Sequence, residues 1–360
     1  MASTYVLEPA TPSGEDASVD RVDLTSLLDP EIAALLLRLP TDVAALTASL
    51  TDDSLDAVRS ALAQPSGRAL SNEVERSTHT VDATSGLTVR VHRPAGVEGD
   101  LPCLYWMHGG GLVLGSAEGD DPRFDRWSAM FGMVGVSVDY RLAPETRYPG
   151  PLDDCYAGLE WVHAHAHDLG VDTSCIGVGG ASAGGGLAAG LGLLARDRGG
   201  PRVAFSLLIY PMIDDRETTV SSTWGDPVWS PAANRYGWTA YLGAEKGGPS
   251  VPQYAAAARA TDLAGLPPTF IGVGALDGFS DEDIDFAVRL RHAGVPVELH
   301  VYAGAPHGFD ALTPTACVAR QAKRDQERWL EHQLRRYGFP AVADRTAPEG
   351  NPASPSEPQI

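Results

Sequence analysis

The stretch CIGVGGASAGGGLAAGLGLLA, residues 175–195, decides the fold. Its first six residues form a short apolar run that predicts a buried strand, and the small residues after position 183 predict a helix. Ser182 lies on the turn between them, with Gly180 and Gly184 on either side in a G-x-S-x-G pattern. A serine on such a strained strand-to-helix turn is exposed at the end of its strand, where it can act as a nucleophile. The pattern alone arises by chance in a chain with 39 glycines, so the strand and the helix around it carry the inference.

Further short apolar runs occur on both sides of this stretch. They cover residues 101–108, 133–140, 203–210, 268–275 and 296–303, and enough chain for a helix separates each run from the next. Near-continuous apolar strands that alternate with helices are typical of a parallel sheet buried on both faces. Residues 78–83 and 87–94, joined at Ser85-Gly86, predict a hairpin. We therefore predict an α/β fold with a mostly parallel central sheet, flanked by helices, that begins with antiparallel strands.

The charge of the chain excludes several classes of partner. Its 360 residues include 27 Lys and Arg against 47 Asp and Glu, which gives a formal net charge of −20. Nucleic acid and anionic membrane surfaces would repel such a protein. No apolar run approaches the ~20 residues that span a bilayer, and the N-terminus has acids where a signal peptide needs basic and apolar regions. We expect a cytoplasmic protein that binds neither nucleic acid nor membranes.

Composition divides the chain into four parts. Residues 1–20 and 341–360 are predicted to be disordered tails, and residues 21–72 a helical segment with a start signal at Asp29-Pro30-Glu31. Residues 73–340 hold the α/β domain, with an insertion at about 213–262 that is rich in Trp and Tyr. The insertion is either ordinary packing or a cap that roofs a pocket, because ligand sites are mostly apolar clefts. On the second interpretation Trp224 and Trp229 bind substrate, and the N-terminal helices join the cap.

A second motif, His108-Gly109-Gly110-Gly111, stands at the end of the apolar run 101–108. Glycines have no Cβ atom, so the backbone there can approach a bound carbonyl and present N–H donors to its oxygen. The alternative is a flexible loop. The position directly at a strand end favours the first interpretation, and we expect His108 and Gly111 to contact substrate.

A nucleophilic serine needs a base, and the base needs an acid that orients it. Asp277 follows the apolar run 268–275, and His307 follows the run 296–303. The chain order Ser182, Asp277, His307 therefore puts each residue just after a strand, at one edge of the predicted sheet. Asp281 and Glu282 are alternative acids, although acids at the start of a helix more often complement its dipole.

These motifs together resemble the hormone-sensitive-lipase-like branch of the α/β-hydrolases, the microbial esterase family. The resemblance covers roughly residues 75–335 and also includes the run Asp139-Tyr140-Arg141-Leu142-Ala143-Pro144-Glu145. It implies an α/β-hydrolase fold with a helical cap and a Ser182–His307–Asp277 triad. The backbone N–H groups of Gly109, Gly110 and Ala183 would form the oxyanion hole. Ala181 departs from the Asp or Thr that the main branches carry, so the subfamily is left open.

The resemblance also implies the reaction. It is hydrolysis of a carboxylic ester through an acyl-enzyme, with short or medium acyl chains or a compact aromatic or lactone ester as substrate, and without a cofactor or metal. An amide, a carbamate or transfer of the acyl group to another acceptor could use the same triad. A receptor that keeps the pocket without turnover is a further alternative. A homodimer through the last strand and the C-terminal helix is common in the family.

The remaining titratable residues are interpreted as structural. The wide spacing of the four cysteines predicts reduced, mostly buried thiols. Three histidines at alternating positions are better explained by a helix surface than by a metal site, and the acid pair at the start of the insertion is expected to be solvated. These residues are Cys103, Cys155, Cys175, Cys317, His163, His165, His167, Asp214 and Asp215.

Overall fold

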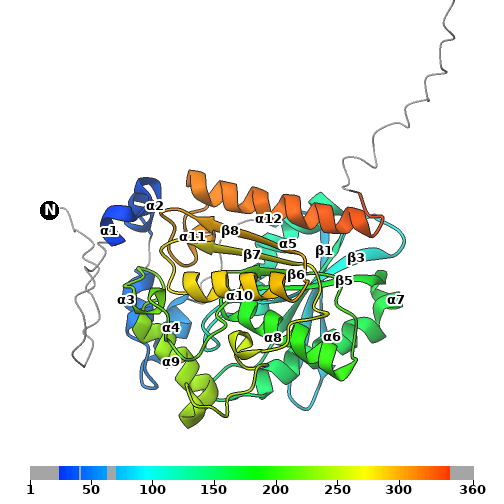
Figure 1. Cartoon of the computed structure of the whole chain (residues 1–360). Helices are drawn as coiled ribbons and strands as arrows, with labels where there is room; N and C mark the ends of the chain where they lie inside the picture. The colour runs from blue at the N-terminus through cyan, green and yellow to red at the C-terminus, as the bar shows by residue number, and fades with distance from the viewer. Residues whose placement is uncertain (1–23, 40–41, 63–69, 341–360) are drawn as a thin grey trace, which may run out of the picture.

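The computed structural model describes residues 24–39, 42–62 and 70–340 (Figure 1). Both predicted tails, residues 1–20 and 341–360, lie outside the described residues. The described residues form one eight-stranded sheet with helices on both faces. None of their helices is long and apolar enough to cross a membrane.

The sheet confirms the predicted α/β class. Its strand order is β1-β2-β4-β3-β5-β6-β7-β8, in which β2 pairs antiparallel with β1 and β4 and every other pair is parallel. All the strand runs expected from the sequence are present. The strands are β1 Val74–Asp82, β2 Leu87–Pro94, β3 Leu101–Met107, β4 Val134–Asp139, β5 Val171–Ala181, β6 Ser206–Ile209, β7 Thr269–Gly274 and β8 Val297–Tyr302.

Helices cover the two faces of the sheet with separate cores. On one face, α5 and α12 bury an aromatic core that includes Trp106, Phe205 and Trp329. On the other face, α6, α8 and α10 bury a core that includes Tyr105 and Leu191. Trp106 and Tyr105 are neighbours in β3 and point to opposite faces, as alternation along a strand requires. Burial on both faces explains why β3 is apolar at every position.

The helices agree with the expected alternation. The N-terminal segment contains α1 to α4, and α2 begins at Pro30 behind the N-cap Asp29 as predicted. The helices are α1 Leu24–Leu27, α2 Pro30–Leu36, α3 Val43–Ala48, α4 Leu55–Leu62, α5 Asp121–Phe131, α6 Gly150–Ala164, α7 Ala166–Leu169, α8 Ala183–Arg198, α9 Pro231–Leu242, α10 Ser280–His292, α11 Phe309–Leu312 and α12 Cys317–Arg336. Short 3₁₀ turns lie at Ala117–Asp120, Ser221–Thr223, Gly243–Glu245 and Ala257–Arg259.

The insertion between β6 and β7 contacts the N-terminal helices. Its helix α9 packs against α3, and the two lie together at one end of the sheet in Figure 1. Thr47 of α3 donates a hydrogen bond of 2.8 Å to the carbonyl of Val228 in the insertion. From α4, the Arg59 guanidinium donates to Val113 O at 2.9 Å and to Glu145 Oε2 at 2.9 Å. The N-terminal helices therefore join the insertion above the loops that follow β3 and β4.

The acid pair that opens the insertion is not solvated, which corrects the expectation. Asp214 and Asp215 are buried, and each carboxylate pairs with an arginine of the insertion. Arg216 makes two bonds of 2.7 Å to Asp214, and Arg259 bonds Asp215 at 2.6 and 2.9 Å. Asp215 also accepts the backbone N–H of Gly247. Buried carboxylates need such partners, and the Asp215–Arg259 pair holds the two ends of the insertion together.

Asp283 on α10 is an exception to this rule. Its side chain is fully buried, and neither carboxylate oxygen has a hydrogen-bond partner among the described residues. Burial, reinforced by the charges of Glu282 and Asp277, raises the pKa of Asp283 well above its ordinary range. The native state therefore holds a proton that the unfolded state has released, so stability falls as pH rises from the unfolded-state pKa toward the native one.

We expect Asp283→Asn to raise the free energy of unfolding, and to raise it more at pH 8 than at pH 5. The amide matches the protonated acid in shape and never ionises, so the difference from wild type should grow as pH rises. Urea unfolding at the two pH values measures it. Asp154→Asn is the control and should destabilise, because Asp154 accepts hydrogen bonds from the Arg141 backbone and guanidinium. A variant less stable than wild type at pH 8 would contradict the argument.

Candidate active site

The turn after β5 holds Ser182 in a strained backbone conformation. Its φ is 57° and its ψ is −122°, which is unusual for a residue with a side chain. Its N–H donates to Ile209 O at 2.9 Å, and its carbonyl accepts from Gly186 and Met212 at 3.0 Å. Bonds in both directions fix the turn, and Ser182 stands at the N-terminus of the 16-residue helix α8. The positive end of the helix dipole therefore faces the serine.

The loops after β7 and β8 bring the predicted acid and base to this serine. His307 Nε2 lies 2.8 Å from Ser182 Oγ, and His307 Nδ1 lies 2.8 Å from Asp277 Oδ2. The other oxygen, Asp277 Oδ1, accepts the N–H of Phe279 at 2.9 Å. All three side chains are buried, with exposed fractions of 7%, 1% and 5% for Ser182, Asp277 and His307. The chain of two hydrogen bonds can move a proton from the serine hydroxyl to the imidazole.

The two alternative acids point elsewhere. Asp281 accepts the N–H of Ser221, and Glu282 accepts the N–H groups of Ile213 and Asp214. Both acids lie in the first turn of α10 and hold the insertion to that helix. Asp277 is thus the acid that contacts the histidine side chain.

The electrostatics of His307 favour its charged form. Burial lowers the pKa of His307, but the adjacent Asp277 charge and its hydrogen bond, together with Asp226 and Asp310, raise it above its ordinary value overall. A base of this kind accepts a proton readily from a hydroxyl.

Three neighbours of His307 were not predicted from the sequence. Tyr210 and Phe279 each present a ring edge-on to the imidazole, with centroids 4.8 and 5.0 Å away. Asp226, in the insertion, accepts the backbone N–H of His307 at 2.7 Å. Tyr210 follows a strand and Phe279 lies two residues after Asp277, so position gave some signal for these two. Nothing in the sequence relates Asp226 to His307.

The glycine motif lies directly against the serine turn. A Cβ atom on Gly109 would lie 3.0 Å from Ala181 O and 3.5 Å from Ser182 Cβ. Gly110 has a φ of 124°, and a Cβ there would overlap Leu114 O at 2.2 Å. The backbone N–H groups of Gly109, Gly110 and Ala183 donate to no other group in the described part of the chain. Three unpaired donors beside Ser182 can receive a developing oxyanion.

His108 supports this loop from beneath. Its ring is 3% exposed and stacks on Tyr140 with centroids 4.2 Å apart, and its Nδ1 donates to Gly109 O at 2.8 Å. Tyr140 in turn donates to His108 O at 2.8 Å. These contacts hold the glycines in place, and the expected contact of His108 with substrate stays a prediction.

The two tryptophans expected to bind substrate differ in their contacts with the site. A Cβ atom on Gly111 would lie 2.1 Å from Cη2 of Trp229, so the Trp229 ring packs on the glycine motif. Trp224 is half-buried two residues before Asp226, and its ring makes no ring contact or hydrogen bond with the triad among the described residues. Only Trp229 is placed against the site by these contacts.

No group of three or more His, Cys, Asp or Glu in the described ranges is arranged to hold a metal ion. The helix predicted to carry the three histidines ends at Ala164, and His165 lies between it and the short helix α7, which carries His167. Cys103, Cys155 and Cys175 are buried free thiols, and Cys317 is exposed.

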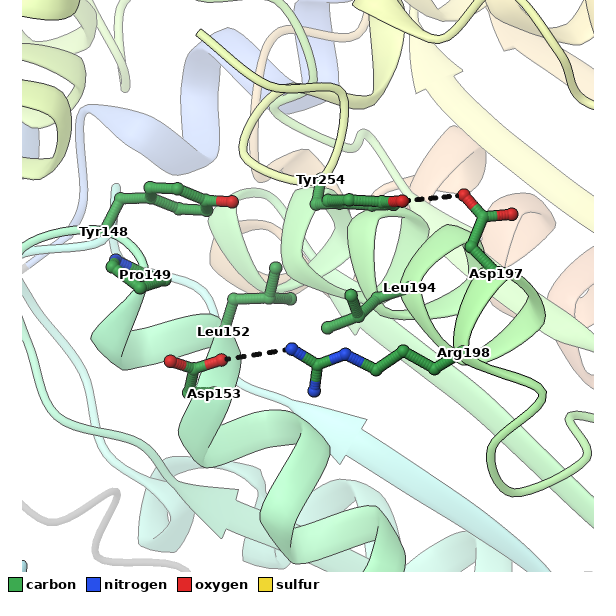
Figure 2. A pocket seen from close by; sticks show the side chains of 8 residues that line it. All are labelled: Tyr148, Pro149, Leu152, Asp153, Leu194, Asp197, Arg198 and Tyr254. Atoms are coloured by element: carbon green, nitrogen blue, oxygen red, sulfur yellow. Dashed lines mark hydrogen bonds and ion pairs between the residues drawn. The ribbon is translucent and has the colours of Figure 1, made fainter.

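A hollow of about 410 Å³ lies away from the triad, between the start of α6 and the end of α8 (Figure 2). Leu152 and Leu194 line it, with Tyr148 and Tyr254 above them in the view. Leu194 is 12 residues along α8 from Ser182, which corresponds to about 18 Å of helix. Asp153 and Arg198 pair across its rim at 4.0 Å.

Known esterases are similar to most of this chain. A family model described as the alpha/beta hydrolase fold matches residues 104–311. Carboxylesterase NlhH of Mycobacterium tuberculosis is 35% identical over 303 residues, which covers 81% of this chain and 92% of that protein. Esterase LipI of the same species is 32% identical and covers 84% and 95%.

Solved structures give the same result. A bacterial heroin esterase superposes with a TM-score of 0.78 at 42% identity, covering 86% of this chain and 98% of that one. Esterase LipW of Mycobacterium marinum has a TM-score of 0.76 at 32% identity, covering 87% and 98%. The chain therefore belongs to the hormone-sensitive-lipase-like family of α/β-hydrolase esterases.

Proposed function

We propose that this protein is a serine carboxylesterase for short or medium acyl chains, or for compact aromatic or lactone esters. The observation that carries the proposal is the pair of 2.8 Å hydrogen bonds that link Ser182 Oγ, His307 and Asp277. The names of relatives support a short acyl group, because one is an ethyl acetate hydrolase of Pseudomonas putida, 30% identical over 239 residues, and another is the heroin esterase. Ethyl acetate carries a two-carbon acyl group.

The reaction follows from the geometry. Ser182 Oγ attacks the ester carbonyl while His307 Nε2 takes its proton, and Asp277 stabilises the imidazolium through Nδ1. The oxyanion of the tetrahedral intermediate rests on the N–H groups of Gly109, Gly110 and Ala183. His307 then protonates the leaving alcohol, and water releases the acid from the acyl-enzyme by the same steps in reverse. No step needs a cofactor.

We also propose that the protein is a homodimer, because the edge of the sheet at β8 is open in the described part of the chain. β8 is the last strand of the sheet, no strand of the described residues pairs with its outer side, and Val301 on it is 44% exposed. Exposed edges of this kind pair readily with a second chain. We expect light scattering to give the mass of a homodimer joined through β8 and α12, and Val301→Lys to lower that mass to a monomer. A monomeric wild type at tens of micromolar would contradict this.

The substrate class is tested with para-nitrophenyl acetate, butyrate, octanoate and palmitate. We expect turnover to fall with chain length, to fall about 10⁴-fold in Asp277→Asn, and to vanish into the background in Ser182→Ala. Activity that survives in Ser182→Ala would mean that the nucleophile is another residue. A wild type that is inert on all four esters but labelled by a fluorophosphonate would point to amide, carbamate or acyl-transfer substrates. An inert and unlabelled protein would point to a receptor.

The pH profile tests the base. Asp277 and its neighbours raise the pKa of His307 overall, and only the neutral imidazole accepts the serine proton. The rate constant kcat/KM should therefore fall as pH drops through that pKa, with a midpoint above the ordinary histidine value of about 6.5. A midpoint well below that value would contradict the charge environment described for His307.

The packing of Trp229 on Gly111 predicts a coupled pair. Gly111 has a φ of 59°, and a Cβ atom there would overlap the Trp229 ring. We expect Gly111→Ala to displace the oxyanion donors and lower kcat/KM about 10²–10³-fold. In a Trp229→Ala background the overlap is absent, so the same change should cost less and leave only the backbone strain.

The matched control for this pair is Gly119→Ala. Gly119 lies on the same stretch after β3, and a Cβ atom there meets nothing within 4 Å. This variant should keep wild-type kcat/KM. An equal loss from Gly111→Ala in both backgrounds would show that the ring contact does not matter.

A further inference from the structure

We propose that Asp226 is a positioning residue that fixes His307 and ties the insertion to it. The inference rests on the proposed function, because it concerns the base of that reaction. Asp226 comes from the insertion between β6 and β7, and His307 follows β8, so 81 residues of chain separate them. Asp226 is 5% exposed, and no Lys or Arg of the described residues forms an ion pair with its carboxylate within 4.0 Å.

The carboxylate of Asp226 joins two loops. Its Oδ2 accepts the backbone N–H of His307 at 2.7 Å. Its Oδ1 accepts the N–H groups of Val228 at 2.7 Å and Trp229 at 3.0 Å. Hydrogen bonds to a charged acceptor are stronger than neutral ones, and three of them converge on this one side chain. The backbone from which the imidazole extends is thereby held at a fixed distance from the insertion.

The same carboxylate is also linked to the glycine motif of the oxyanion hole through Trp229. It holds the backbone of Trp229, and the Trp229 ring packs on Gly111 of the oxyanion motif. A shift of Asp226 would therefore move both the base and the ring above the oxyanion donors. Catalytic geometry tolerates displacements of only about 0.5 Å, so a link of this kind has a direct effect on the rate.

The charge of Asp226 acts on His307 as well. The groups that face this part of the imidazole are Asp277 and Asp310, which are acidic, and Tyr210, whose hydroxyl donates to Asp310 Oδ1 at 2.8 Å. Burial, together with the nearby Asp277 charge, raises the pKa of Asp226 to about 6. Above that pH the carboxylate is charged and helps to stabilise the imidazolium that forms when Ser182 loses its proton.

Asp226→Asn removes the charge and one or two of the three hydrogen bonds while keeping the shape. If the amide oxygen accepts from His307, the amide nitrogen faces the N–H donors of Val228 and Trp229. In the reverse orientation the amide nitrogen faces the N–H donor of His307. We expect kcat/KM on para-nitrophenyl butyrate to fall about 10–100-fold, a part of the ~10²–10⁴ that general base catalysis contributes. The acid limb of the kcat/KM profile should also move to lower pH, because the imidazolium loses a stabilising charge.

Asp226→Glu separates position from charge. It keeps the negative charge but lengthens the side chain in a buried site, so kcat should fall while the acid limb stays where the wild type has it. This variant also carries the test if Asp226→Asn does not fold. A wild-type kcat in Asp226→Glu would overturn the positioning role.

Asp215→Asn is the matched control, because Asp215 is equally buried in the same insertion and accepts hydrogen bonds from Gly247 and Arg259 without touching His307. It should lower the unfolding temperature and leave the acid limb unchanged. If Asp226→Asn also lowers only the unfolding temperature, the residue is purely structural and the inference fails. Failure of the proposed function is distinct, because it would appear as a wild type without Ser182-dependent ester turnover.

Discussion

The close contact between the turn at Ser182 and the end of β3 is the constraint on which the site depends. A Cβ atom on Gly184 would lie 2.1 Å from Met107 O, and one on Gly180 would lie 2.2 Å from Gly184 O. Backbone must therefore pack on backbone here, which only glycine allows. This contact brings the oxyanion donors after β3 beside the nucleophile after β5, although 74 residues separate His108 from Ser182. The strained φ of Ser182 persists because its N–H donates to Ile209 in β6 and its carbonyl accepts from Gly186 and Met212.

The parallel sheet then supplies the other two groups. β5, β6, β7 and β8 run in one direction, so the loops that carry Ser182, Asp277 and His307 all leave the same edge. The sheet does not fix the backbone of the base directly, because His307 lies five residues past the end of β8 at Tyr302. Side chains hold it instead. Asp226 accepts its backbone N–H and Asp277 contacts its Nδ1, and the rings of Tyr210 and Phe279 pack against the imidazole.

Much of the fold could be predicted because it depends on local patterns. Apolar runs of strand length, the start signal at Asp29-Pro30 and the G-x-S-x-G turn each need only a few neighbouring residues, and the structure contains the corresponding elements. The burial of Asp214 and Asp215 could not be predicted, because their partners include Arg259 from the far end of the insertion. The contact of Asp226 with His307 could not be predicted for the same reason. The insertion has no regular alternation of apolar residues, so its sequence does not indicate where a side chain lies.

The insertion therefore has two roles: it packs on the N-terminal helices, and it contacts the site. Its outer half packs on the N-terminal helices through α9, while the turn at residues 224–229 reaches the base and the glycine motif. A substitution in this turn changes the space above the oxyanion donors and the support of His307 at the same time. The same carboxylate accepts the backbone N–H groups of Trp229 and His307, so a change that moves it affects both residues. Because of this coupling, the acid and the two loops that it joins must change together if the catalytic geometry is to be kept.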